Sequence, residues 1–132
     1  MATKFTKEES ILALAHLVAH KDGHTDTESD FIQKKLKPFY GLDKKTDWNN
    51  FLDKWNTIKA GPSDWSSNVE QGCINTLKKC NYDMRVKACA AIWAVSYDTD
   101  KNWSDEEGKL FWRVLKALNV KKDDAKAEYA KI

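Results

Sequence analysis

The sequence has few of the residues that interrupt helices, with five glycines and two prolines among 132 residues. It also has no sustained alternation of apolar and polar residues, which is the pattern of a half-buried strand. Apolar residues instead recur every three or four positions along most of the chain. We therefore predict an all-α fold, a single helical bundle of about seven helices in one domain that spans residues 1–132.

The sequence has no large excess of either charge. It contains 22 Lys and Arg residues and 20 Asp and Glu residues, which gives a net charge of +2. Arg85 and Arg113 are the only arginines. This composition lacks both the strong positive field and the bidentate donors that favour nucleic-acid recognition. The sequence also has no secretory signal and no apolar run long enough to span a membrane. We expect a cytoplasmic protein that binds protein partners, does not bind nucleic acid and does not insert into a membrane.

Cysteine is scarce, and none of the three cysteines forms a C-x-x-C pair. Cys73 and Cys80 lie on one predicted helix at a spacing of roughly 10 Å, which is too far for a disulfide. Cys89 lies on an apolar helical face. We predict reduced, mostly buried thiols and no thiolate metal site. The G-x-x-x-x-G-K-[ST], G-x-G-x-x-G and G-x-S-x-G motifs are also absent, so we predict no enzymatic activity.

Helix starts are marked by three S/T-x-x-E capping boxes, Thr6 with Glu9, Thr25 with Glu28, and Ser104 with Glu107. Gly61-Pro62 breaks the chain in the middle, and Ser63 is the expected cap of the helix that follows. We expect helices over about 7–20 and 26–37, another from Thr46 or Asp47, and a short last helix from about Asp123.

The same pattern occurs twice, about eighty residues apart: an apolar helix, an acidic turn and a capped second helix. The copies read ILALAHLVAHKDGHTDTESDFIQKKL and VKACAAIWAVSYDTDKNWSDEEGKLFWRVLKAL. Asp22-Gly23 lies at the first turn, and Asp98 and Asp100 lie at the second. The repeat predicts that the bundle is built from two pseudo-repeated helical hairpins.

Each predicted turn gathers oxygen ligands of the kind that Ca²⁺ or Mg²⁺ prefers. The second turn is not an EF-hand, because Trp103 replaces the required Gly and Lys109 replaces the bidentate Glu. The alternative is a solvated turn whose acids cap the next helix. The candidate ligands are Asp22, Asp26 and Glu28 in the first copy and Asp98, Asp100, Asn102, Glu106 and Glu107 in the second.

All three histidines lie between residues 16 and 24, and His16 and His20 have the i, i+4 spacing of the H-E-x-x-H zinc helix. Leu17 occupies the position of the catalytic Glu, which excludes metalloprotease chemistry. The pair could bind a transition metal together with a carboxylate such as Asp22. The alternative is that both histidines lie on the polar flank of the first helix.

Six tryptophans are many for this length, and Trp48, Trp55 and Trp65 lie close together in the middle of the sequence. One interpretation makes them core residues at helix contacts. The other makes them the walls of an aromatic groove for a partner helix.

The two hairpins resemble the TerB family of tellurite-resistance-associated proteins and the related module of some membrane-bound J-domain co-chaperones. Asp22-Gly23 and Glu28 match the family pattern in the first copy, although that copy is one residue shorter before its capping pair. In the second copy the matching residues are Asp100, Trp103, Ser104 and Glu107, and Leu118-Asn119-Val120 matches the L-G-[LIV] end. Lys101 stands where the family prefers Gly.

The resemblance implies a non-enzymatic cytoplasmic bundle that binds divalent cations through its acids in metal-stress or signalling complexes. Our first hypothesis is therefore a TerB-like module with two cation sites in its acidic turns. The alternative hypothesis is a metal-independent interaction module that uses the tryptophan groove.

Overall fold

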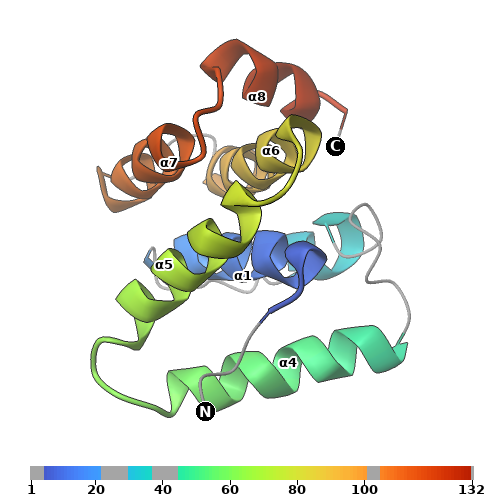
Figure 1. The fold of residues 1–132 in the computed structure, drawn as a ribbon. Helices are drawn as coiled ribbons and strands as arrows, with labels where there is room; N and C mark the ends of the chain where they lie inside the picture. Colours follow the sequence, from blue (N-terminus) through green and yellow to red (C-terminus); the bar gives the residue numbers. More distant parts are fainter. Residues whose placement is uncertain (1–4, 22–29, 37–44, 101–104, 132) are drawn as a thin grey trace.

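The computed structural model describes the backbone of residues 5–21, 30–36, 45–100 and 105–131, and the side chains of 5–20, 30–36, 47–96 and 108–131. These residues form a bundle of seven helices without strands, which confirms the all-α prediction (Figure 1). In chain order the helices are α1 (Lys7–Lys21), η1 (Ile32–Leu36), α4 (Lys45–Lys59), α5 (Trp65–Lys78), α6 (Tyr82–Asp100), α7 (Asp105–Ala117) and α8 (Lys122–Tyr129).

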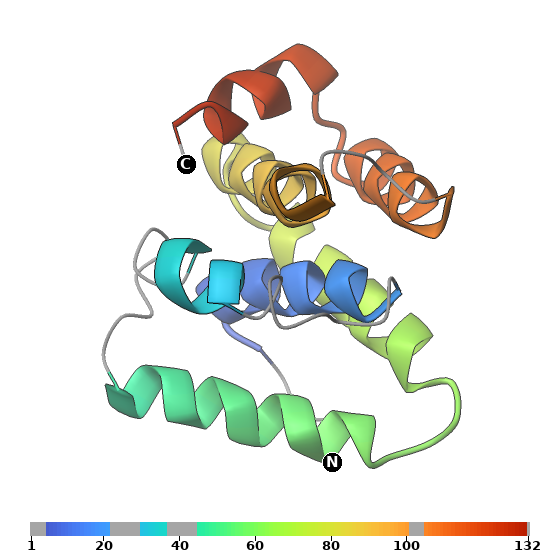
Figure 2. The same cartoon turned by 180° about the vertical axis from the view of Figure 1, so that it is seen from behind.

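Helix α1 lies at the centre of the bundle. Every residue from Glu9 to Ala19 is buried, whereas an amphipathic surface helix buries only one stripe. Helices α5 and α6 pack most extensively against α1, and η1 and α7 also contact it. Figure 2 shows α1 between α6 above and α4 below. The recurrence of apolar residues every three or four positions therefore underestimates the burial of α1, because neighbouring helices cover it on all sides.

The start of α1 is fixed by the first predicted capping box. The Thr6 amide donates to Glu9 Oε1 at 2.9 Å, and the Glu9 amide donates to Thr6 Oγ1 at 3.2 Å. Lys54 of α4 also places its Nζ 2.6 Å from Glu9 Oε1. The box is thus confirmed, and its buried carboxylate connects α1 to α4. The other two predicted boxes include residues outside the described part of the chain.

An aromatic layer separates α4 from α1. Phe51 and Trp55 of α4 are buried, and their rings lie 5.2 and 5.4 Å from the ring of His16 in α1. Trp48 stacks on Phe51 at 5.4 Å, and Phe5 packs against the same ring at 5.6 Å. These large side chains lie between α1 and α4, two helices whose ribbons are set apart in Figure 1.

Three helix ends differ from the expected capping or add to it. The N-cap of α5 is Asp64 rather than Ser63, and it makes no side-chain capping bond. Asn81 caps α6 by accepting the Met84 amide at 3.0 Å. At the end of α7, Asn119 has a φ of 54°, and the Val120 amide bonds the Leu115 carbonyl at 3.1 Å. This is the left-handed termination that Gly, and sometimes Asn, adopts.

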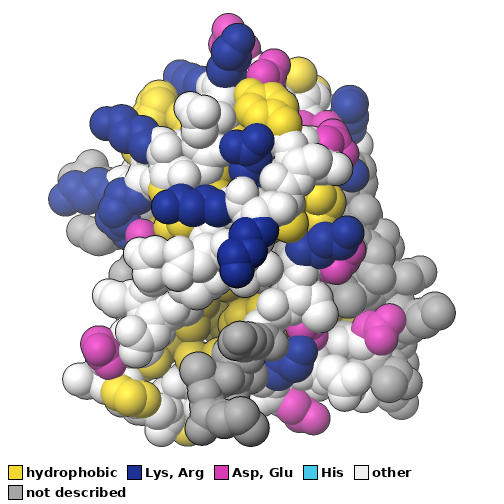
Figure 3. All heavy atoms as spheres, viewed as in Figure 1, with side chains coloured by type: hydrophobic (Ala, Val, Ile, Leu, Met, Phe, Trp, Pro, Cys, Tyr) yellow, Lys and Arg dark blue, Asp and Glu magenta, His cyan; other side chains and the backbone are white. Residues whose placement is uncertain are grey.

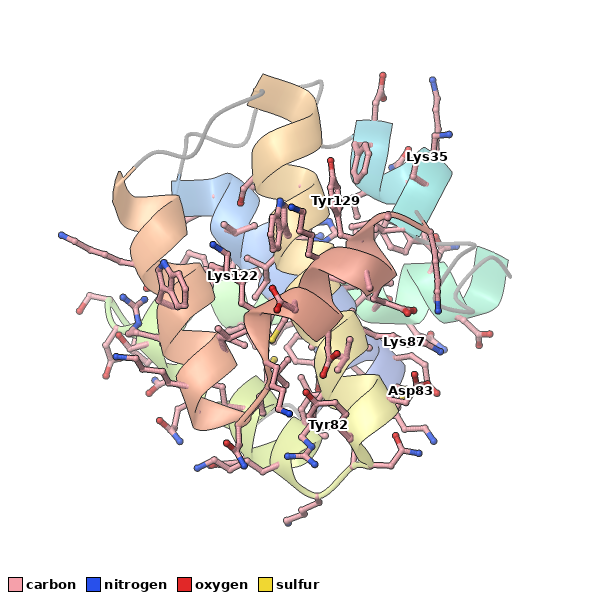
Figure 4. All side chains as sticks on the ribbon, turned by 90° about the horizontal axis from the view of Figure 1, so that it is seen from above. Lys35, Tyr82, Asp83, Lys87, Lys122 and Tyr129 are labelled. Atoms are coloured by element: carbon pink, nitrogen blue, oxygen red, sulfur yellow. The ribbon has the colours of Figure 1, made fainter. Side chains whose placement is uncertain are left out.

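Helix α8 is attached along α6, and Figure 4 shows Tyr82 and Tyr129 at the two places where they meet. The Tyr82 hydroxyl donates to Asp124 Oδ2 at 2.6 Å and accepts the Lys121 amide at 3.0 Å. Its bond to the Asp124 carboxylate raises the pKa of Tyr82, because ionisation would break that bond. Tyr129 stacks on Trp93 with the ring centroids 5.6 Å apart.

The predicted pairing of helices is present, with one difference in helix type. Helix α1 contacts η1, and α6 contacts α7. Residues 22–29, which include the first turn, lie outside the described part. The helix expected over 26–37 is described from residue 30, and its segment Ile32–Leu36 is π-helical rather than α-helical. Ile32 and Leu36 are fully buried, so the π turn still presents one apolar face.

Candidate functional site

The predicted acidic ligands are divided between described and undescribed segments. Asp22, Asp26, Glu28 and Asn102 lie outside the described residues. Asp98 and Asp100 belong to α6, which continues to Asp100, so their prediction as turn residues is wrong. Glu106 and Glu107 lie in the first turn of α7. The side chains of these four helical acids are outside the described part.

The end of α6 has an unusual charge for a helix C-terminus. The last turn carries Asp98 and Asp100 and no basic residue. Backbone carbonyls give a helix C-terminus a partial negative charge, so cations stabilise it and carboxylates do not. Two acids at this end are therefore unfavourable unless a cation or a basic group compensates them.

The two candidate transition-metal ligands have different environments. His16 is buried with 5% of its surface exposed, and its Nδ1 lies 2.9 Å from the Leu12 carbonyl oxygen. His20 is exposed and places its ring edge against Trp65, 4.9 Å between centroids. The expectation of two histidines on a polar flank is wrong for His16, because α4 covers that side of α1. Among the described side chains, no group of three His, Cys, Asp or Glu is close enough to hold a metal ion.

The three tryptophans proposed as groove walls do not share one environment. Trp48 and Trp55 are 6% and 3% exposed and belong to the aromatic layer of the core. Trp65 is half-buried and packs edge-on against Trp55 at 5.7 Å. Of the three, Trp65 lines a cavity beside α5, and Trp48 and Trp55 are not among the residues that line it.

This cavity, which we call the α5 cavity, has a volume of about 790 Å³. It lies between α5, the C-terminal end of α4 and the start of α1. Figure 3 shows a hollow with hydrophobic side chains at its floor in this region, below the Lys and Arg side chains of the upper face. The main apolar lining residues are Phe5, Ile58, Pro62, Trp65, Val69 and Cys73.

Ser10 is the most unusual polar residue of the α5 cavity. It is fully buried, and its hydroxyl lies beside the Cys73 thiol. Burial raises the pKa of Cys73 to about 12, and the hydrogen bond with Ser10 opposes this rise only in part. The thiol is therefore neutral near pH 7, and a neutral thiol is a weak hydrogen-bonding group.

The cysteines agree with the sequence prediction where they are described. All three are free, with Cys73 and Cys89 buried and Cys80 half-buried. Burial also raises the pKa of Cys89 to about 12. Both buried thiols therefore stay protonated near neutral pH and are poor nucleophiles.

Sequence reasoning missed the α5 cavity because its walls come from three separate segments. Two local signals were present, a serine inside the apolar run of α1 and a glycine in the middle of α5. A Cβ added to Gly72 would meet no heavy atom within 4 Å, so this position borders open space.

No family model, no curated protein and no solved structure matches the chain. The resemblance to the TerB family therefore rests on the sequence motifs alone. None of the helices in the described residues is both long and apolar enough to cross a bilayer.

Proposed function

We propose that this protein is a non-enzymatic binding module whose binding element is the α5 cavity. The observation that carries the proposal is an apolar cavity of about 790 Å³ beside Trp65. Concave sites of this size, with mostly apolar walls and a few polar groups, are typical ligand sites. This is a narrower form of the metal-independent module predicted from the three tryptophans, since Trp65 is the one that reaches the cavity.

The test is binding of a neutral apolar fluorophore, N-phenylnaphthylamine, to the full chain. We expect saturable one-to-one binding with increased emission. Gly72→Leu should weaken it, because Gly72 lines the cavity and a Cβ added there meets no atom within 4 Å, so the larger side chain takes up space at the cavity wall. Gln71→Leu is the matched control, since Gln71 is exposed on the same helix and does not line the cavity.

Two outcomes contradict the proposal. The fluorophore could fail to bind the unmodified protein in a saturable way. It could also bind Gly72→Leu and Gln71→Leu equally well, which would place it elsewhere on the surface. Circular dichroism of each variant confirms that the helices are retained.

A second candidate function is divalent-cation binding in a TerB-like module of metal-stress or signalling complexes. It is favoured by the acids Asp98 and Asp100 in the last turn of α6, a turn that contains no basic residue. The left-handed φ of Asn119, at the position where the family pattern has Gly, also agrees with the resemblance. In this hypothesis Ca²⁺ or Mg²⁺ neutralises the end of α6, and Asp22, Asp26 and Glu28 form the second site.

Titration of the metal-free protein with Ca²⁺, Mg²⁺, Mn²⁺ and Zn²⁺ tests the second candidate. We expect saturable shifts of the backbone amides around residues 98–107 with Ca²⁺ or Mg²⁺. The double change Asp98→Asn and Asp100→Asn should remove them, whereas Asp123→Asn, an exposed acid of α8, should not. Shifts that survive the double change would place the cation elsewhere, and no saturable shift would make the acids ordinary helix-end residues.

A further inference from the structure

We propose that the α5 cavity binds an amphipathic monocarboxylate, such as a medium-chain fatty acid, whose carboxylate contacts Lys79 and Asn75 at the rim. This inference rests on the proposed function and specifies the chemical class of its ligand. It follows from the charge of the cavity walls, from the hydrogen bonding of Asn75 and from the extended apolar lining along α5.

The charge of the cavity walls favours an anionic group at the rim. Lys79 is the one charged residue among the described residues that line the cavity, and no Asp or Glu is among them. Lys79 is exposed, so its ammonium group stays hydrated and charged. An anion beside it meets an opposite charge and no like charge from the walls. A cationic ligand is repelled at the same place.

Asn75 supplies a second donor one helical turn before Lys79. Lys79 is the C-cap of α5 and Asn75 precedes it by four residues, so the two share one face, and both line the cavity. The Asn75 Oδ1 accepts a hydrogen bond from Gln71 Nε2 at 3.0 Å, which leaves the Asn75 amide group to donate elsewhere. An ammonium and an amide N–H are both donors, and an ionised carboxylate is an acceptor only. The pair therefore favours a carboxylate.

The lining of the cavity extends along the whole of α5. Residues of this helix contribute at alternating steps of four and three, namely Trp65, Val69, Gly72, Thr76 and the C-cap Lys79. The first and last of them are separated by roughly 21 Å at 1.5 Å per residue. This shape suits an extended chain with a charge at one end better than a compact ligand.

The end of the cavity away from Lys79 is apolar. Ile58 near the end of α4, Pro62 between the helices and Trp65 at the start of α5 line it. Hydrocarbon placed against these side chains leaves water, which tightens binding by up to roughly fourfold per methylene group. A fatty acid fits both ends, because its chain can lie along α5 while its carboxylate stays hydrated at the rim. Its charge need not enter the apolar part, where loss of hydration would be strongly unfavourable.

Three probes with the same ten-carbon chain test the inference, decanoate, 1-decanol and decyltrimethylammonium. Each is measured at neutral pH by displacement of N-phenylnaphthylamine from the full chain. We expect decanoate to bind more tightly than decyltrimethylammonium. Lys79→Met should weaken decanoate about threefold, the effect of one exposed ion pair, and leave 1-decanol unchanged. Lys78→Met is the matched control, because Lys78 is the neighbouring exposed lysine and does not line the cavity.

Asn75→Asp tests the second donor and the orientation of the ligand. The change keeps the size of the side chain but replaces a donor by a negative charge. We expect it to weaken decanoate about tenfold, through the lost hydrogen bond and the added repulsion, and to leave 1-decanol unchanged. Asn68→Asp is the matched control, because Asn68 is also exposed on α5 and lines the cavity nearer Trp65. It should change decanoate much less.

The outcomes separate this inference from the proposed function. If Lys79→Met weakens decanoate no more than Lys78→Met does, or Asn75→Asp no more than Asn68→Asp, the carboxylate is not at this end of the cavity and the inference is overturned. It is also overturned if decyltrimethylammonium binds as tightly as decanoate, or if decanoate does not displace the fluorophore. In each case the fluorophore still binds and the proposed function stands. If the fluorophore itself does not bind saturably, both proposals fail.

Discussion

Helix α1 packs against α6 through small side chains and against α4 through large aromatic side chains. Toward α6 the packing is extensive, and both helices contain fully buried alanines, among them Ala13 in α1 and Ala91 and Ala94 in α6. Toward α4 the contact is made by a layer of large rings around Phe51. Small side chains let two backbones approach closely, whereas rings hold them apart.

This difference explains where the α5 cavity lies. Alanines leave little space between α1 and α6. Aromatic rings are rigid and cannot fill the space next to them. The cavity opens at the end of α4, beside Ile58 and Trp65. The side of α1 that faces α4 is therefore the side that has room for a ligand.

Phe51→Ala removes the central ring of the aromatic layer. We expect the free energy of unfolding to fall by about 3–5 kcal/mol, because a fully buried ring is lost and a void remains. Urea unfolding followed by circular dichroism measures the change. Phe51→Leu, which keeps most of the volume, should lose clearly less. Losses below about 1 kcal/mol for both variants would show that the layer does not hold α4 in place.

Ala91→Leu enlarges a fully buried residue of α6, the helix that packs extensively against α1. Overpacking should lower the free energy of unfolding by about 1–3 kcal/mol. Ala127→Leu on the exposed surface of α8 is the control and should be nearly neutral. Equal effects at the two positions would mean that the α6 side tolerates larger side chains, which contradicts the close packing inferred here.

Thr6→Ala removes the hydroxyl of the capping box at the start of α1. The expected loss is about 1 kcal/mol, since the Glu9 amide loses its acceptor. Thr6→Ser keeps the hydroxyl and should restore most of the stability in the same unfolding experiment. If the serine variant is as unstable as the alanine variant, the threonine methyl group rather than the cap is responsible.

Gly72→Ala adds one methyl group at the border of the cavity. It should raise the free energy of unfolding by about 0.5–1 kcal/mol, because the helix gains a better helix former and the new Cβ meets no atom within 4 Å. Thermal and urea unfolding both measure this gain. A loss of stability instead would mean that the space above Gly72 is occupied in solution.

The helices were largely predictable because their signals are local. The Thr6–Glu9 box, the break at Gly61-Pro62 and the short last helix are all present, within one or two residues of the expected bounds. The errors also have local causes. Asp64 rather than Ser63 precedes α5, and α6 continues through Asp98 to Asp100, because helix periodicity does not mark the last turn of a helix.

The candidate site was much less predictable. His16 and His20 share a helical face in sequence, yet α4 buries the first and leaves the second exposed. Trp48 and Trp65 were grouped because they lie close along the chain, but one is in the core and the other lines the cavity. Both distinctions depend on which helix covers a position, and no local pattern encodes that.

The sequence alone determined that this protein is helical, where most of its helices begin and which residues are apolar, because capping and periodicity act within a few residues. Tertiary structure decided that α1 is buried on all sides, that an aromatic layer supports α4 and that Ser10 faces a cavity. Those features arise where segments from α1, α4 and α5 meet. Burial and a cavity are properties of such a meeting of segments, and no single segment possesses them.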